Sequence, residues 1–281
     1  MVSQHRAAIV RILIGLLLGG GLLLGYSDSD FDGVSDDKDD CPNTPITNLV
    51  DRYGCSIIKI MDNDPMGSQY DVILGYIYDR ADYGTSEDIA TLTNTFQVDA
   101  FMENWGAELF TSYFVSDANQ SERSGMNDTT LSLYYGYRAL EEYNIFLRLR
   151  LGAIFPTKKS HYNKMDYLAS LSANVIINGY ALFGGYTYTF VGDEDIEFYE
   201  FQNTHAFHVG AGYYIKANIY MSLSYLYANS IVKQADNIRS ASLYLFYGIN
   251  TNWFATLSYS QGLSSSTSDL ASNLRIGYYF Q

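Results

Sequence analysis

From Tyr70 to the C-terminus, hydrophobic and polar residues alternate with a period of two. The alternation is clear in "LSLYYGYRA", "IFLRLRLGAIF", "YMSLSYLYA" and "LRIGYYF", where Tyr, Leu, Ile and Phe hold one parity and Ser, Arg, Gly and Asn hold the other. This period is typical of β-strands with two different faces. No stretch of the region carries a convincing helical period, so the pattern predicts an all-β domain.

The alternating stretches predict about twelve strands with a mean length of about eleven residues. That length suits a strand that crosses a membrane at a tilt better than the five or six residues of a soluble sheet. The predicted strands are Tyr70–Asp79, Thr91–Met102, Trp105–Val115, Thr129–Leu140, Asn144–Phe155, Met165–Ile177, Tyr180–Val191, Thr204–Ile215, Asn218–Ala228, Ile238–Ile249, Trp253–Gly262 and Leu270–Phe280.

The connections between these strands alternate in length. Short turns are expected at "ENW", "LEEY", "NG", "KA" and "NTN", whereas the intervening loops, such as "SDANQSERSGMND", "PTKKSHYNK", "VGDEDIEFYEFQN" and "SSSTSD", are longer and polar. Short periplasmic turns and long extracellular loops are typical of bacterial outer-membrane barrels, in which an even strand number leaves both barrel ends in the periplasm. Residues 70–281 are therefore predicted to form a transmembrane antiparallel β-barrel in the outer membrane.

Parity also predicts which residues face the lipid and which face the lumen. Leu131, Leu133, Tyr135 and Tyr137 are expected on the lipid face of one strand, with Ser132, Tyr134 and Gly136 on its lumen face. A charge on the lipid face at the midplane costs about 2–4 kcal/mol, so strands two to five are expected to turn their charges inward. These predicted lumen residues are Asp99, Glu103, Glu108, Arg138, Arg148 and Arg150. Either they bridge the lumen and close it, which the need of buried charges for partners favours, or they line a narrow water path.

The N-terminus has the features of an export signal. His5, Arg6 and Arg11 precede or open the apolar run "ILIGLLLGGGLLLG", Ile12 to Gly25. This run has roughly the length of a signal-peptide core and is too short to span a bilayer comfortably as a helix. Residues 1–26 are therefore predicted to be a signal peptide, with a retained membrane anchor as the alternative.

Composition and charge narrow the choice of partners. The formal net charge of −14 argues against nucleic acid and anionic surfaces as partners unless divalent cations bridge them. The two cysteines, Cys41 and Cys55, both follow the signal closely. In an exported protein, two such cysteines indicate a disulfide rather than a metal pair or a redox couple.

The stretch "DSDFDGVSDDKDDC" contains seven aspartates within residues 28–41. It matches the calcium-loop pattern D-x-[DN]-x-[DN]-G-x5-E, with an Asp in place of the terminal Glu. Gly33 permits the sharp turn that lets the oxygen ligands before and after it converge. A solvated acidic linker is the alternative. The predicted Ca²⁺ ligands are the side chains of Asp28, Asp30, Asp32, Asp36 and Asp39 and the carbonyl of Val34.

The longer stretch "DSDFDGVSDDKDDCPNTPITNLVDRYGC" resembles the thrombospondin type 3 repeat in the short form found in OmpA-like outer-membrane proteins. The resemblance implies calcium binding and a Cys41–Cys55 bridge. In those proteins the repeat usually links a barrel to a C-terminal peptidoglycan-binding domain, whereas here it precedes the barrel. No such domain is found downstream, so peptidoglycan binding is not expected. The domain prediction is thus a repeat at 27–56, the linker "IIKIMDNDPMGSQ" at 57–69 and the barrel at 70–281.

The function predicted from these features is that of an integral outer-membrane barrel with a periplasmic calcium-binding segment. Its role would be structural or that of a porin for small solutes, it would contact lipids and lipopolysaccharide, and it would not be an enzyme. One alternative is a lipid hydrolase built from His208, Ser222 and Ser224, with His205 facing outward near the external rim. The other is an adhesin whose acidic loop, with Asp193, Glu194, Asp195, Glu197 and Glu200, binds divalent cations shared with lipopolysaccharide.

Overall fold

A computed structural model describes residues 39–41, 69–82, 89–102, 104–118, 121–139, 145–158, 162–177, 180–196, 198–216 and 218–280. The chain divides into two compact units, Met1–Ser56 and Ile57–Gln281. The predicted signal peptide, the linker up to 68 and most of the predicted calcium segment lie outside the described residues. The described part of the chain contains no helix that is both long and apolar enough to span a membrane.

The second unit consists of β-strands. They are β1 (Gln69–Ala81), β2 (Ile89–Met102), β3 (Trp105–Ala118), β4 (Ser121–Met126), β5 (Thr129–Ala139), β6 (Ile145–Phe155), β7 (Asp166–Ile177), β8 (Tyr180–Phe190), β9 (Thr204–Lys216), β10 (Ile219–Ala228), β11 (Ile238–Gly248), β12 (Trp253–Gly262) and β13 (Leu270–Phe280).

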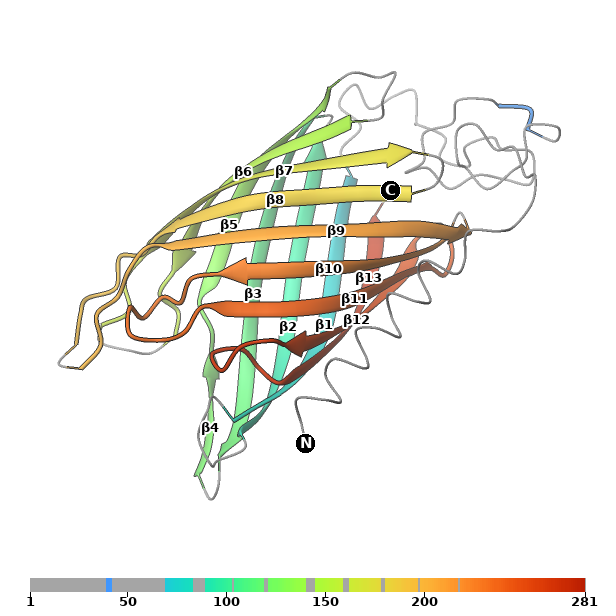
Figure 1. The fold of residues 1–281 in the computed structure, drawn as a ribbon. Coiled ribbons are helices and arrows are strands. Elements are labelled where there is room, and N and C mark those ends of the chain that lie inside the picture. The colour runs from blue at the N-terminus through green and yellow to red at the C-terminus, as the bar shows by residue number, and fades with distance from the viewer. Residues whose placement is uncertain are drawn as a thin grey trace. The chain divides into compact units, whose positions relative to one another are not determined.

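These strands form a closed antiparallel barrel with twelve strand positions (Figure 1). β1 pairs with β2 on one side and with β13 on the other, which closes the sheet. β4 and β5 share one position, because both pair with β3. β4 pairs with the segment from Tyr113 to Ala118, and β5 pairs with the segment from Trp105 to Phe110. The predicted all-β barrel and its twelve strand positions are confirmed.

One predicted loop is wrong. The sequence predicted a loop at "SDANQSERSGMND", but β4 forms there and extends the β2–β3 hairpin. The segment "SERSGM" carries no alternation of apolar and polar residues. A strand beyond the lipid has water on both faces, so nothing selects an apolar parity, and pattern reasoning cannot detect it.

The two ends of the barrel differ in their connections. One end carries the short links after β2, β5, β7, β9 and β11, and we call it the turn end. The other end, the loop end, carries the longer links, including 156–165, 191–203 and 229–237. Tyr70 pairs with Phe280, so the chain enters and leaves the barrel at the turn end. The predicted asymmetry of the connections is confirmed.

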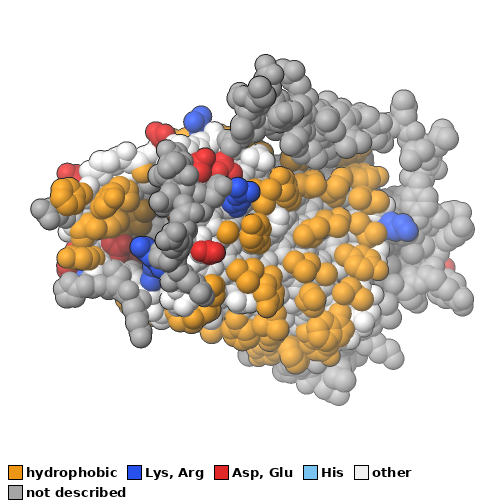
Figure 2. All heavy atoms as spheres, turned by 90° about the horizontal axis from the view of Figure 1, so that it is seen from below, with side chains coloured by type: hydrophobic (Ala, Val, Ile, Leu, Met, Phe, Trp, Pro, Cys, Tyr) orange, Lys and Arg blue, Asp and Glu red, His pale blue; other side chains and the backbone are white. Residues whose placement is uncertain are grey.

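The outer surface of the barrel is apolar. Leu133 is 59% exposed, and Leu149, Leu171 and Leu274 are also exposed on the outside. Figure 2 shows a broad band of hydrophobic side chains on one face of the barrel, with most of the charged side chains in view towards one side of it. The alternation of faces predicted from parity is confirmed, and an exposed apolar band of this kind is what a lipid environment requires.

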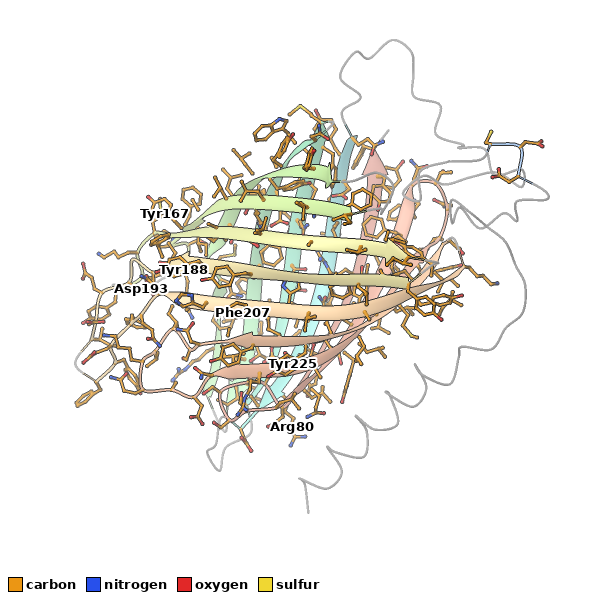
Figure 3. The ribbon with its side chains drawn as sticks, turned by 45° about the horizontal axis from the view of Figure 1, so that its top comes forward. Arg80, Tyr167, Tyr188, Asp193, Phe207 and Tyr225 are labelled. Atoms are coloured by element: carbon orange, nitrogen blue, oxygen red, sulfur yellow. The ribbon has the colours of Figure 1, made fainter. Side chains whose placement is uncertain are left out.

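Aromatic residues flank this band at both ends. Outward aromatic pairs lie near the turn end, among them Trp105–Tyr135 and Trp253–Tyr278, with ring centroids 4.8 and 4.9 Å apart. Nearer the loop end, β8 and β9 carry Tyr188 and Phe207 (Figure 3). Two aromatic belts are typical of the membrane–water interfaces of a spanning barrel.

Candidate functional site

The candidate site is the inner wall of the barrel, where charged side chains away from the strand ends are confined to one half. The strands β13, β1, β2, β3, β5 and β6 are consecutive in the sheet, and we call their inner face the charged arc. Its described charged residues are Asp71, Asp79, Asp99, Glu108, Arg148, Arg150 and Arg275.

Three of these acids form a row near the turn end. Asp71 pairs in register with Asp99, and Asp99 pairs in register with Glu108. Residues opposite each other on neighbouring strands share a face and a height, so the three carboxylates follow the wall around the barrel. Asp71 and Asp99 are only 4% and 5% exposed.

A hydrogen-bond network joins this row to arginines. The Gln97 side-chain amide donates to Asp99 Oδ2 at 2.6 Å, and Arg275 Nη2 donates to Gln97 Oε1. Arg150 Nη2 makes a charged hydrogen bond to Glu108 Oε1. Glu108 lies on β3 and Arg150 on β6, with only β5 between them, so this ion pair follows the wall. This pair therefore does not make the bridge across the lumen that the sequence predicts for such charges.

Tyr134 fills the space between the acids and the arginines. The guanidinium of Arg148 lies 4.9 Å from the centre of the Tyr134 ring, a cation–π contact. The ring covers Gly106, where an added Cβ would lie 2.1 Å from Tyr134 Cζ. Glycine is needed at this position because no other residue leaves room for the ring. The ring is therefore held flat against the wall.

The structure places four of the six predicted lumen residues on the charged arc. Asp99 and Glu108 join the acid row, and Arg148 and Arg150 lie on β6 with Arg150 paired to Glu108. Glu103 lies outside the described residues. Arg138 pairs with Phe146 in the sheet, but its side chain lies outside the description.

Sequence reasoning missed Asp71, Gln97 and Arg275. The alternation of the sequence already placed all three on the inner face. Asp71 and Gln97 have the inward parity of β1 and β2, and Arg275 stands between the outward Leu274 and Ile276. Extending the parity argument to the first and last strands would have found Asp71 and Arg275.

The other half of the inner wall, from β7 to β12, is uncharged, and we call it the uncharged arc. Away from the strand ends, its described inward positions hold no Asp, Glu, Lys or Arg. Hydroxyl groups pair across strands here, as Thr187 does with Ser170 at 3.0 Å and Ser242 with Ser260 at 2.7 Å.

Aromatic rings of the uncharged arc also lie on glycines of the neighbouring strand. Tyr220 covers Gly212, where an added Cβ would lie 2.2 Å from the tyrosine hydroxyl oxygen. Phe254 covers Gly277 in the same way, with the added Cβ 2.1 Å from the ring. Both arcs therefore hold bulky inward side chains against the wall.

The residues of the hydrolase alternative do not form a catalytic arrangement among the described side chains. His208 faces inward, as predicted, but its ring lies over Gly185 and beside Phe183, with centroids 6.4 Å apart. In the sheet, His208 pairs with Leu226, while Ser222 and Ser224 pair with Gly212 and Gly210. His205 faces outward, also as predicted, and hydrogen-bonds to Tyr186.

The acids of the 191–203 loop hold neighbouring loops together. Asp193 accepts a hydrogen bond from the Lys164 backbone N–H at 2.9 Å, and Glu194 forms an ion pair with the Lys164 side chain at 3.4 Å. Glu200 pairs with Lys233 at 2.9 Å, and Asp195 accepts from the backbone of Phe201. Asp193 stands in this loop in Figure 3. Glu197 lies outside the described residues.

The predicted calcium segment is described only at Asp39, Asp40 and Cys41. The backbone N–H of Cys41 donates to Asp39 Oδ1 at 2.8 Å. Among the described residues, no group of three or more His, Cys, Asp or Glu side chains could hold a metal. The other predicted ligands and Cys55 lie outside the described residues, so the calcium site and the Cys41–Cys55 bridge stay predictions.

Comparison with known proteins gives a fold relationship. No protein-family model matches the chain, and no curated protein matches it. Among solved structures, the COG4313 outer membrane channel from Pseudomonas putida F1 matches with a TM-score of 0.60 at 12% identity, covering 77% of this chain and 96% of that one. The KdgM porin matches with a TM-score of 0.49 at 12% identity, covering 74% and 99%. The chain thus shares the fold of a bacterial outer-membrane channel.

Proposed function

We propose that this protein is an outer-membrane channel for small solutes. The observation that carries the proposal is that most inward side chains are accessible to solvent. Among the described residues, only Ile73, Ala81, Tyr134, Ile176, Ala181 and Phe254 are buried hydrophobic side chains. Most other inward side chains are partly exposed, and Arg148 is exposed although it points inward. A barrel whose interior is polar and accessible behaves as a water path rather than as a packed core.

The pairing of charges along the wall supports the same proposal. Glu108 and Arg150 satisfy each other without crossing the lumen, and Gln97 links Arg275 to Asp99. Buried charges need such partners, and partners on the same wall leave the centre of the barrel open. The structural alternative, a closed barrel, would instead require side chains to meet across the lumen.

Conductance in planar lipid bilayers tests the proposal. The purified full-length protein, reconstituted in 1 M KCl, is expected to insert with discrete conductance steps of uniform size. The matched control is Leu149→Arg, which puts a charge on the lipid face and is expected to reduce insertion, because such a charge costs about 2–4 kcal/mol at the midplane. Barrels that insert fully but conduct no ions would leave only the structural role.

We also propose that residues 28–39 bind Ca²⁺ in the periplasm, with Cys41 and Cys55 bridged. The ligand spacing and Gly33 support the proposal. An outer-membrane location with the turn end in the periplasm follows from the usual arrangement of short turns. Calorimetry on the oxidised full-length protein in detergent is expected to detect Ca²⁺ binding at or below millimolar concentration, lost in Asp28→Ala/Asp32→Ala, which removes two side-chain ligands, and kept in Asp37→Ala. Equal binding by both variants would remove the assignment.

A further inference from the structure

Six inward aromatic residues form a row near the turn end of the barrel, made of two groups of contacting rings that adjoin on β11. They come from the five consecutive strands β9 to β13. The first group is Tyr214, Tyr220 and Tyr244, with centroid distances of 4.8 Å for Tyr214–Tyr220 and 6.3 Å for Tyr220–Tyr244. The second is Phe246, Phe254 and Tyr279, with distances of 5.7 Å for Phe246–Phe254 and 4.7 Å for Phe254–Tyr279. Tyr244 and Phe246 are two positions apart on the inner face of β11.

The wall holds this row in place. Tyr220 lies on Gly212, and Phe254 lies on Gly277. Phe254 is 5% exposed and packs between Phe246 and Tyr279. The four tyrosines and Phe246 remain partly exposed on the lumen side. The row therefore offers aromatic faces and hydroxyl groups to a solute in the lumen, with Phe254 as the packing residue beneath them.

At its β13 end the row meets the hydrogen-bond network of the charged arc. Tyr279 pairs in register with Asp71, which pairs with Asp99. Gln97 and Arg275 extend the network from Asp99, so a carboxylate stands beside the last ring of the row, and amide and guanidinium groups follow along the same wall. These planar groups present acceptors and donors in fixed directions.

The charges of the acid row and of its arginines are balanced. The three acids Asp71, Asp99 and Glu108 are matched by the three arginines Arg148, Arg150 and Arg275. This balance favours neither a cation nor an anion as the bound solute. An aromatic surface beside planar hydrogen-bonding groups complements a solute that has an apolar ring face and hydroxyl groups at its edge.

We propose that the row of six aromatic residues, with the Asp71–Asp99–Gln97–Arg275 network at its end, is a binding site for neutral saccharides. Sugar rings stack on the partly exposed tyrosines, and their hydroxyls hydrogen-bond to the tyrosine hydroxyls and to the network. The inference rests on the proposed channel function and names the class of solute that the channel takes.

Interruption of the ion current by a saccharide tests this site. Maltotriose at millimolar concentration is expected to interrupt the current of the full-length protein reversibly. Tyr244→Leu is expected to raise the half-blocking concentration about fivefold, as the loss of one aromatic contact predicts. Tyr247→Leu is the matched control, since Tyr247 is on the same strand but faces outward with 44% exposure, and it is expected to leave the block unchanged.

The outcomes separate the saccharide site from the channel function. A conducting protein that maltotriose does not block, or that tetraethylammonium or glucuronate blocks more strongly, overturns the saccharide proposal and leaves the channel intact. An equal shift in Tyr244→Leu and Tyr247→Leu overturns the location of the site. If the protein conducts no current, the channel proposal fails, and calorimetry with maltotriose in detergent tests the site alone. Heat of binding lost in Tyr244→Leu would support the site, and absence of heat in the unsubstituted protein would overturn it.

Discussion

The charged and uncharged arcs have the same backbone pattern and the same kind of outer surface, yet the polar groups of their inner faces differ. In the charged arc, side chains of opposite charge and amides are linked across strands, as in the Arg275–Gln97–Asp99 chain. In the uncharged arc, hydroxyls and aromatic rings take these places, as in the Ser242–Ser260 pair. Lipid requires an apolar side chain at every outward position that it contacts, whereas the lumen accepts charged, polar and aromatic side chains. The inward parity of each strand is therefore where the chemistry of the barrel is encoded.

The difference between the arcs assigns them different tasks. Fixed charges act over about a Debye length and bias which ions enter. Aromatic faces act only in contact, because stacking requires rings within a few ångströms. We therefore expect substitutions of the charged residues to act mainly on ion selectivity and substitutions of the row tyrosines to act mainly on contact with the solute.

The largest effect is expected where the arcs are alike, at the glycines under the rings. Gly106→Ala in the charged arc and Gly212→Ala in the uncharged arc each place a Cβ about 2 Å from a tyrosine ring or its hydroxyl. The ring must swing off the wall, at a cost of about 1–3 kcal/mol in the free energy of unfolding, and it then narrows the lumen. Urea unfolding in micelles and single-channel conductance measure both effects.

Gly136→Ala is the matched control for these glycine substitutions, because its added Cβ meets nothing nearer than the Asn104 carbonyl oxygen at 3.8 Å. It is expected to change the unfolding free energy by less than about 0.5 kcal/mol. Equal losses in Gly136→Ala and Gly106→Ala would contradict the view that covered glycines hold the inner wall in both arcs.

The next largest effect is a change in ion selectivity, and it is expected from substitutions in the charged arc. Arg150→Gln leaves Glu108 without its ion-pair partner in a row of three acids. One uncompensated charge about 8 Å from a passing ion in water is worth about 0.5 kcal/mol, favourable for a cation and unfavourable for an anion, so the cation-to-anion permeability ratio is expected to rise about fivefold in 0.1 M KCl. Glu108→Gln should shift the ratio towards anions. Reversal potentials across a KCl gradient measure both, and shifts of the same sign in the two variants would refute the assignment.

Much of this barrel is predictable because its determinants are local. Alternation within a strand sets the faces, which is why the lumen position of Glu108 and the outward position of Leu149 follow from sequence alone. The pairing of Asp99 with Glu108 is local too, since a tight turn joins their strands and fixes the register.

What could not be predicted is non-local. Arg275 and Gln97 are 178 residues apart in the chain, and their contact depends on closure of the barrel through β1 and β13. The two-arc division likewise appears only when the strands are placed in ring order. The calcium segment differs from these contacts, because its predicted ligands follow from the spacing of neighbouring residues alone. Calcium binding there remains a prediction.

A smaller effect is expected when a charge is moved into the uncharged arc. Ser258 lies on an inward position of β12 and pairs with Tyr244 and Asn273. Ser258→Asp adds one negative charge that neighbouring hydroxyls and lumen water solvate, so it is screened more than Glu108 in its row. The cation-to-anion ratio in 0.1 M KCl should rise about twofold. Ser258→Asn controls for size, and a shift in that variant would show that shape and not charge is responsible.

The smallest effect should be that of salt on the saccharide block, and it separates stacking on the tyrosines from the action of the fixed charges. Raising KCl from 0.1 to 1 M shortens the Debye length from about 10 to about 3 Å, so the selectivity change caused by Arg150→Gln should largely disappear. Stacking of a neutral ring carries no net charge to screen, so the half-blocking concentration of maltotriose should change by less than about twofold. If the saccharide block weakened with salt as steeply as ion selectivity does, the fixed charges and not stacking on the tyrosines would hold the sugar, and the two halves of the wall would be one electrostatic site.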